Sequence, residues 1–83
     1  MSPQELNELT RVRPFVPFRI HMTGGTTYDI LNPEFISVGR TIAAVFKRQD
    51  PNAPIFDTGL WISLVHIVQI ETITEPATAG GVQ

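Results

Sequence analysis

The stretch RPFVPFRIHMTGGTTY, from Arg13 to Tyr28, decides the fold of this 83-residue chain. Two prolines set its entry, and apolar residues then alternate with polar ones until Gly24 and Gly25 turn the chain back. The apolar side chains are Phe18, Ile20 and Met22, and the polar ones are Arg19, His21 and Thr23. Such alternation next to a glycine pair is typical of a β-hairpin. We therefore expect a small, strongly bent antiparallel sheet.

A short helix is predicted before the hairpin. Ser2 suits the N-cap, Pro3 suits the first helical position, and Glu5 follows the cap by three residues, as in a capping box. The helix should span residues 3–12, because Pro14 pushes the residue before it out of the helical conformation. Its apolar stripe consists of Leu6, Leu9 and Val12. A stripe this narrow predicts a helix that rests on the sheet and covers an open barrel end.

Four further strands are predicted after the turn, at residues 26–31, at 41–47, from 55 to a short break near 65–66, and from that break to about 74. Asn32-Pro33 ends the first of these strands, and a short apolar piece at 35–38 precedes the next. Residues 41–47 are apolar on both faces. We therefore expect a barrel interior on one side of that strand and a helix or a neighbouring subunit on the other.

Composition bounds the class of protein. The chain is 42% hydrophobic, has a formal net charge of −2 and lacks cysteine, so we expect one folded domain without disulfides or thiolate metal sites. The start of the chain does not resemble a secretory signal, and no apolar run reaches the roughly 20 residues of a membrane span. We expect a soluble, cytoplasmic protein that does not contact membranes. Its small core favours a homo-oligomer.

Catalysis and cofactor binding are not predicted. His21 and His66 are the only side chains that ordinarily titrate near neutral pH. Neither stands at the spacing of a metal-ligand pair, and the spacing suggests no nucleophile with its base and acid. Gly24-Gly25 lacks the helix and the lysine that follow in a phosphate-binding loop. We expect a protein that is not an enzyme and holds no metal or cofactor.

The order of one short helix and five strands, with a single tight turn before the last strand, resembles the Sm-like small β-barrel. FRIHMTGGTTYDI, residues 18–30, is similar to the family's first hairpin, and ISLVHIVQIE, residues 62–71, is similar to its last two strands. The chain also resembles a group of short bacterial proteins of unknown function with an RPFxPFxIHxxxG opening and an HPEF-type element, here at residues 32–35.

The resemblance implies a mostly β fold: a small five-stranded, strongly bent antiparallel barrel with a short N-terminal α-helix. This single Sm-like domain should cover residues 1–74, and residues 75–83 hold little that could pack, so we expect a flexible tail. The oligonucleotide-binding barrel is the alternative fold, since it has the same number of strands in another connectivity.

Two functions are compatible with such a barrel. The first is a non-enzymatic binding or scaffold module of unknown ligand, which forms a ring-shaped homo-oligomer by pairing strand edges of adjacent subunits. The residues expected at that interface are Trp61, Ile62, Val68 and Ile70. Trp61 is interpreted as packing against a subunit or helix, or as stacking on a base or a protein partner.

The alternative function is single-stranded RNA binding by an Sm-like ring. Sm-like RNA binders use an Asp and an Asn in the loop after the second strand and a basic pair in the last tight turn, which the resemblance places near residues 32 and 66. The expected RNA-binding residues are Asn32, Arg40 and His66. No basic residue directly precedes His66, and the acidic charge balance is unusual for a general nucleic-acid binder.

Overall fold

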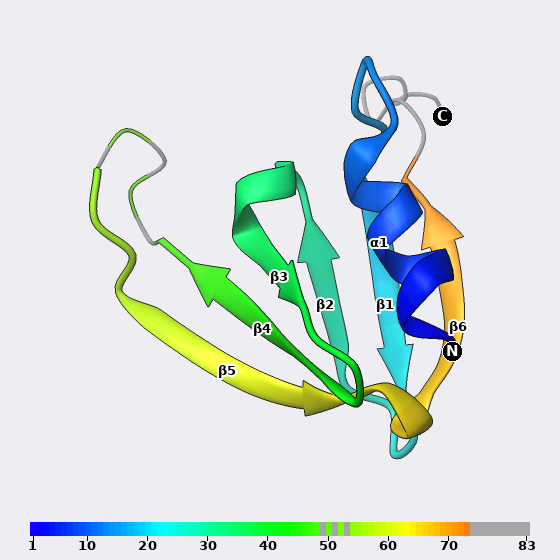
Figure 1. Ribbon diagram of the computed structural model, residues 1–83. Coiled ribbons are helices and arrows are strands. Elements are labelled where there is room, and N and C mark those ends of the chain that lie inside the picture. The colour runs from blue at the N-terminus through cyan, green and yellow to red at the C-terminus, as the bar shows by residue number, and fades with distance from the viewer. Residues whose placement is uncertain (49, 51, 53, 74–83) are drawn as a thin grey trace, which may run out of the picture.

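The computed structural model describes residues 1–48, 50, 52 and 54–73. Within them the chain forms a mostly β domain of one α-helix and two three-stranded antiparallel sheets (Figure 1). In chain order the elements are α1 (Pro3–Arg11), β1 (Phe18–Met22), β2 (Thr27–Ile30), the 3₁₀ turn η1 (Pro33–Phe35), β3 (Ile36–Val38), β4 (Ile42–Lys47), β5 (Thr58–Ser63), the 3₁₀ turn η2 (Leu64–His66) and β6 (Ile67–Thr72).

Helix α1 begins as the sequence predicts. The Ser2 hydroxyl accepts a hydrogen bond from the Glu5 amide at 3.1 Å, and the Ser2 amide donates to Glu5 Oε1 at 3.3 Å, which satisfies two amides that would otherwise lack partners. The helix ends at Arg11, one residue before the expected end, because Val12 is extended. Leu6 is fully buried and Leu9 packs against the core, but Val12 is exposed. The apolar stripe therefore stops short of the predicted one.

The first sheet, which we call sheet A, has the strand order β2-β1-β6. The hairpin turns at Gly24 and Gly25, whose φ angles are +96° and +98°, a backbone conformation that glycine adopts without the steric cost of a Cβ. The β1–β2 register pairs Phe18 with Ile30 and Ile20 with Tyr28. These apolar residues face inward, so the predicted hairpin and its turn are confirmed.

The second sheet, sheet B, has the strand order β3-β4-β5, and it corrects the expected fold. The short piece at 35–38 contributes a sixth strand, because Ile36–Val38 pairs with β4. Pro33 lacks an amide hydrogen and begins η1, and this turn separates β2 from β3 where one bent strand would have joined the sheets. The described strands thus form two separate sheets rather than a closed five-stranded barrel.

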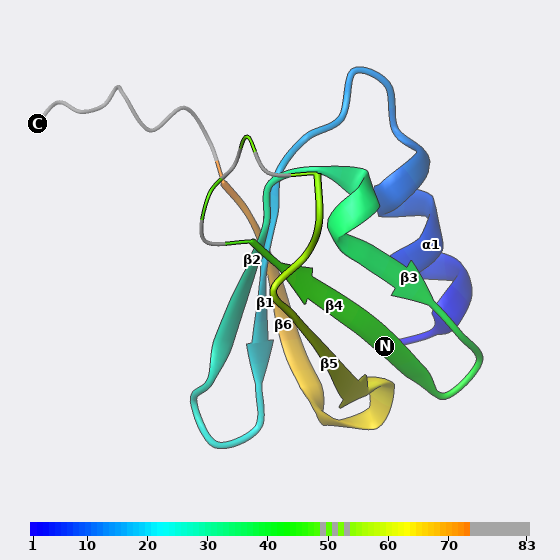
Figure 2. The same ribbon diagram turned by 90° about the vertical axis from the view of Figure 1, so that its left-hand side faces the viewer.

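The hydrophobic core lies between the inner faces of the two sheets and α1. Helix α1 packs beside β3 (Figure 2). Buried residues of the core are Leu6, Phe18, Ile20, Ile30, Ile36, Ala43, Val45, Ile62, Leu64 and Ile67. Every sheet strand and the helix supply at least one side chain that is buried in this core or packs against it, so the two sheets are held together by apolar packing and by the covalent connections η1 and η2.

Candidate functional site

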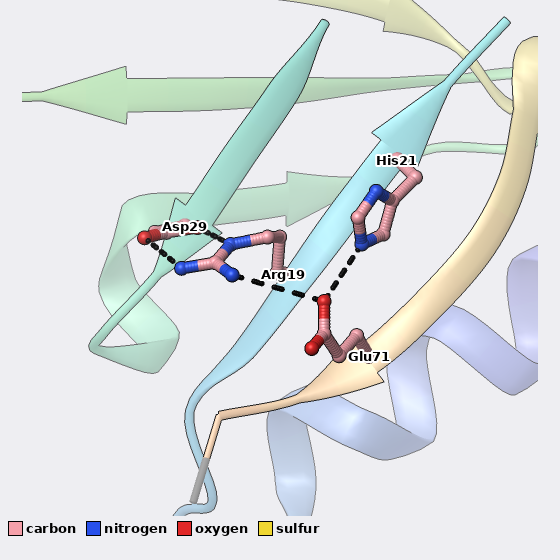
Figure 3. Close-up of polar contacts among 4 residues, drawn as sticks. All are labelled: Arg19, His21, Asp29 and Glu71. Carbon is pink, nitrogen blue, oxygen red and sulfur yellow. Dashed lines mark hydrogen bonds and ion pairs between the residues drawn. The ribbon is translucent and has the colours of Figure 1, made fainter. Parts of the chain in front are cut away.

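The outer face of sheet A carries a line of charged residues that cross its three strands (Figure 3). The register places Arg19 of β1 opposite Asp29 of β2 on one side and Glu71 of β6 on the other. Arg19 Nε donates to Asp29 Oδ1 at 2.7 Å and Nη2 donates to Oδ2 at 3.1 Å, while Nη1 lies 3.7 Å from Glu71 Oε1. The two parallel bonds to Asp29 fix the guanidinium plane.

Glu71 also contacts His21. His21 Nε2 lies 2.8 Å from Glu71 Oε1, so one carboxylate oxygen of β6 faces two cationic or polar side chains of β1. When the imidazole is protonated this contact becomes an ion pair. Its geometry orients the His21 ring and ties β6 to β1.

The Arg19–Asp29 pair has an electrostatic consequence for Asp29. Its hydrogen bond to Arg19 lowers the pKa of the Asp29 carboxyl below the ordinary value of 3.8, with the charges of Arg19 and His21 acting in the same direction and partial burial opposing them. The same bond and the charge of Asp29 raise the pKa of Arg19. Both side chains are therefore charged at neutral pH.

A depression lies beside this line of charges, at the edge of sheet A. Its volume is about 510 Å³, and its lining residues are Arg19, His21, Thr27, Tyr28, Asp29 and Lys47. Lys47 reaches it from the end of β4 in the other sheet, with Nζ 5.6 Å from the centre of the Tyr28 ring. That distance lies within the range of a cation–π contact. The depression is the place where polar side chains of both sheets converge.

The three residues expected to bind RNA do not come together. Arg40 and His66 lie at the same end of the fold, because the Leu64 amide at the start of η2 donates to the Thr41 carbonyl at 2.9 Å. The His66 carbonyl accepts from the Thr23 amide beside the hairpin turn, whereas Asn32 follows the far end of β2 (Figure 1). Asn32 is thus separated from His66 by the length of β2.

The four residues expected at a subunit interface divide into two groups. Trp61 and Val68 are exposed, at 74% and 65% of their surface. Ile62 is buried in the core and Ile70 packs against the core from β6, so these two side chains already have apolar neighbours within one chain. Only Trp61 and Val68 offer an accessible apolar surface among the four.

Trp61 belongs to a larger apolar surface on the outer face of sheet B, which we call the Trp61 face. The register sets Trp61 beside Ala44, and Ser63 beside Ile42. Ile42 is 40% exposed, while Phe46 covers Gly59 and packs against Phe56 with ring centres 5.2 Å apart. The outward residues of β4 are therefore apolar along the strand, as the sequence indicated.

The charged line and the depression were not predicted from the sequence. The pairing of Arg19 with Asp29 could have been found, because a hairpin that turns at Gly24-Gly25 sets those two residues opposite each other. Glu71 and Lys47 carry no such local signal. Each reaches the site through pairing or packing with a segment far away in the sequence.

Two absences concern the part of the chain that the structure describes. In residues 1–48, 50, 52 and 54–73, no three histidine or acidic side chains are placed to hold a metal ion. Within the same residues, no helix is long and apolar enough to span a membrane. Comparisons of the chain with protein-family models, with curated proteins and with solved structures find no match.

Proposed function

We propose that this chain is a non-enzymatic binding or scaffold module that acts as a homo-oligomer, built on an Sm-like arrangement of strands. One observation carries the proposal: Trp61 is 74% exposed on the outer face of sheet B, next to the open edge of β5. A sheet that is apolar on both faces is ordinarily covered on both. A second copy of the chain is the occupant that the strand edges favour.

The free edges of the two sheets support a second copy of the chain as the binding partner. Strand β5 is an edge of sheet B, strand β6 is an edge of sheet A, and each is six residues long. Antiparallel pairing of β5 with β6 of a second copy would join the sheets of two subunits and bring Trp61 near Val68 of the neighbour. Such pairing removes two unprotected edges, which natural proteins rarely leave open.

The element order supports the Sm-like arrangement. When β2 and β3 are taken as two halves of one strand bent at η1, the chain consists of a helix and five strands, with η2 as the tight turn before the last one. This is the order that the resemblance implies. Closure of the barrel would then be supplied by neighbouring subunits rather than within one chain.

The test uses the single tryptophan of the chain. Light scattering gives the mass as the protein is diluted, and the emission of Trp61 is followed on the same samples. We expect a mass that is a multiple of the 9.2 kDa of one chain, with Trp61 emission shifting to the red as the assembly dissociates. A mass of one chain at every concentration, with red emission throughout, would overturn the oligomer.

Matched variants locate the interface. Trp61→Ser and Val68→Lys should each give a folded monomer, because both side chains are exposed in the single chain. Val16→Ser changes an exposed valine in the segment between α1 and β1 and should leave the mass unchanged. Equal loss of mass in all three variants would argue against an interface at β5 and β6.

A second candidate function, single-stranded RNA binding, is favoured by one contact. The Leu64–Thr41 hydrogen bond holds the turn that carries Arg40 against η2, which carries His66. In a ring these two loops would be repeated around one end, so a weak basic site would be multiplied by the number of subunits. Asn32 is left out of this proposal because it lies at the opposite end of β2.

Titration of short uridine-rich and adenine-rich RNA, followed by anisotropy at several salt concentrations, tests the second candidate. RNA binding predicts that log affinity falls with log salt with a slope of about −0.7 per phosphate contacted. Arg40→Ser should reduce the slope and the affinity, while Arg11→Ser at the end of α1 should not. No binding at low salt would eliminate RNA as the ligand.

A further inference from the structure

The depression at the edge of sheet A is lined by hydrogen-bond donors that make no hydrogen bond to the residues that the structure describes. Within the residues that the structure describes, the Lys47 ammonium has no ion pair and the hydroxyl groups of Thr27 and Tyr28 make no hydrogen bond. His21 uses Nε2 toward Glu71, and its Nδ1 makes no hydrogen bond to a described residue. Three lining residues of sheet A and one of sheet B thus carry a polar hydrogen or a ring nitrogen that no hydrogen bond to a described residue uses.

The charges of the lining select the kind of ligand. Arg19 is held by Asp29 and contacts Glu71, so its charge is matched by acids of the same face. Lys47 is the lining cation without such a match among the described residues. The nearby carboxylates of Asp29 and Glu71 repel a second negative charge. The site therefore favours an anion with one negative charge over a dianion.

The size and the aromatic wall add a second constraint. A volume of about 510 Å³ lies within the range of small-molecule sites. Tyr28 is half-buried and packs against the core, so its ring forms a fixed wall beneath the Lys47 ammonium. A ligand with a carboxylate and a short apolar part would satisfy both features.

We infer that this depression, which we call the Lys47 site, binds the carboxylate group of a small acid or of an acidic peptide side chain. Lys47 forms the ion pair, the Tyr28 and Thr27 hydroxyls donate to the carboxylate oxygens, and Arg19 and Asp29 hold the adjoining wall in place. None of its lining residues belongs to β5 or β6, so the Lys47 site is formed within one chain and does not require the oligomer proposed above.

The experiment records amide NMR spectra of the full chain at pH 7 and constant ionic strength, with chloride as the balancing anion. Acetate, butyrate and inorganic phosphate are titrated separately. We expect saturable shifts at Thr27, Tyr28 and Lys47 with dissociation constants on the order of millimolar for the carboxylates, since one exposed ion pair and two hydrogen bonds give little more. Shifts that grow linearly and equally with chloride would overturn the site, and tighter binding of phosphate would overturn the assignment to carboxylates.

Variants then test the residues. Lys47 is the only lysine in the chain, and Lys47→Met should weaken acetate binding by about tenfold or more. Tyr28→Phe keeps the ring in the core and should weaken binding by about threefold. Arg40→Met, which removes a cation from the other end of β4, should change nothing. Binding that survives Lys47→Met unchanged, in a variant whose spectrum shows it folded, would refute the inference.

A capped peptide of glycine, glutamate and glycine separates the two sources of the carboxylate. Binding about tenfold tighter than acetate would identify a protein segment as the source, because the peptide backbone would then add contacts at the open edge of β2. Binding equal to that of acetate would identify a free small acid. Either result supports the Lys47 site, whereas shifts that avoid residues 27, 28 and 47 would contradict it.

Discussion

On the outer face of sheet A, Arg19, Asp29 and Glu71 form ion pairs across three strands, whereas on the outer face of sheet B Ala44 lies beside Trp61, which is largely exposed. Both sheets turn an alternating set of apolar residues toward the same core. The difference between their outer faces therefore does not arise from the needs of the core. It shows that the outer face of sheet A is suited to contact with water, whereas the outer face of sheet B leaves apolar side chains exposed to it.

A polar outer face is stable in contact with solvent. The charges of sheet A are paired with one another, and exposed ion pairs of this kind contribute at most about 1 kcal/mol each. The Trp61 face has no such compensation, because exposing a tryptophan side chain forgoes the burial that would stabilise it. This difference supports the two proposals above, in which a small ligand binds at the edge of sheet A formed by β2 and a second copy associates through the edges β5 and β6.

The largest difference between the core and the outer face of sheet B is expected for two neighbouring residues of β5. Ile62→Ala removes a side chain buried in the core and should lower the free energy of unfolding by about 2–5 kcal/mol. Trp61→Ser, on the outer face, should change it by less than about 0.5 kcal/mol when measured below the concentration of assembly. Urea unfolding followed by circular dichroism measures both. A comparable loss in Trp61→Ser would mean that the Trp61 face is already covered within one chain.

The turns of the two sheets offer the next comparison. At Gly39, between β3 and β4, an added Cβ would lie 2.9 Å from the Ile42 carbonyl oxygen, so Gly39→Ala should cost about 1–3 kcal/mol through crowding. At Gly24 an added Cβ meets nothing within 4 Å, but φ is +96°, so Gly24→Ala should cost about 1–2 kcal/mol through backbone strain.

Asparagine distinguishes the two causes. It adopts positive φ more readily than alanine, so Gly24→Asn should recover part of the stability lost in Gly24→Ala. Gly39→Asn should recover none, because its Cβ meets the same oxygen. The melting temperatures of the four variants test this expectation. If Gly39→Asn were more stable than Gly39→Ala, backbone strain rather than crowding would explain the loss of stability at Gly39.

The smallest effect is expected from the charges of sheet A. The pKa of Asp29 in the folded chain is below its ordinary value of 3.8, so its ion pair stabilises the fold above that value and the contribution is lost as the pH falls through the lowered pKa. Because the Asp29 side chain is 42% exposed, Asp29→Asn should cost at most about 1 kcal/mol at pH 7. The cost should vanish once the pH has fallen below the lowered pKa of Asp29.

A double-mutant cycle isolates this pair. In the background of Arg19→Gln, the change Asp29→Asn should have little further effect on the free energy of unfolding at pH 7. Added salt should reduce the coupling between Arg19 and Asp29, since the pair is largely exposed. A coupling that is unaffected by salt and by pH would show that the charged line is not what holds these side chains.

Local signals predicted the start of the fold well. The cap at Ser2 and the turn at Gly24-Gly25 act within a few residues, and both are found where the sequence indicates. The number of strands was wrong because Ile36–Val38 is too short to show a period of its own, and it becomes a strand only through pairing with β4. Local pattern cannot reveal a pairing that depends on where the next strand lies.

The site was harder to predict than the fold. Asn32 was grouped with His66 because the Sm-like resemblance implies RNA-binding residues in both loops, but Asn32 precedes η1 and lies at the opposite end of β2 from His66. Glu71 meets Arg19 only because β6 returns to β1 across most of the chain. Ile62 was expected at an interface, but the inward side of β5 could be assigned only once the core was known.

The two 3₁₀ turns connect the two sheets, and the number of residues in a turn determines which side chains of the next strand face the core. Each is three residues long. The strand after η1 alternates, with Ile36 buried and Ser37 exposed, whereas the strand after η2 has a register shift in its pairing with β1. One residue inserted into η1 would reverse the parity of β3, turning Ile36 toward solvent and Ser37 toward the core. The irregular start of β6 can take up an inserted residue as a bulge, which leaves Ile70 opposite Ile20. Changes of length should thus be far less tolerated at η1 than at η2.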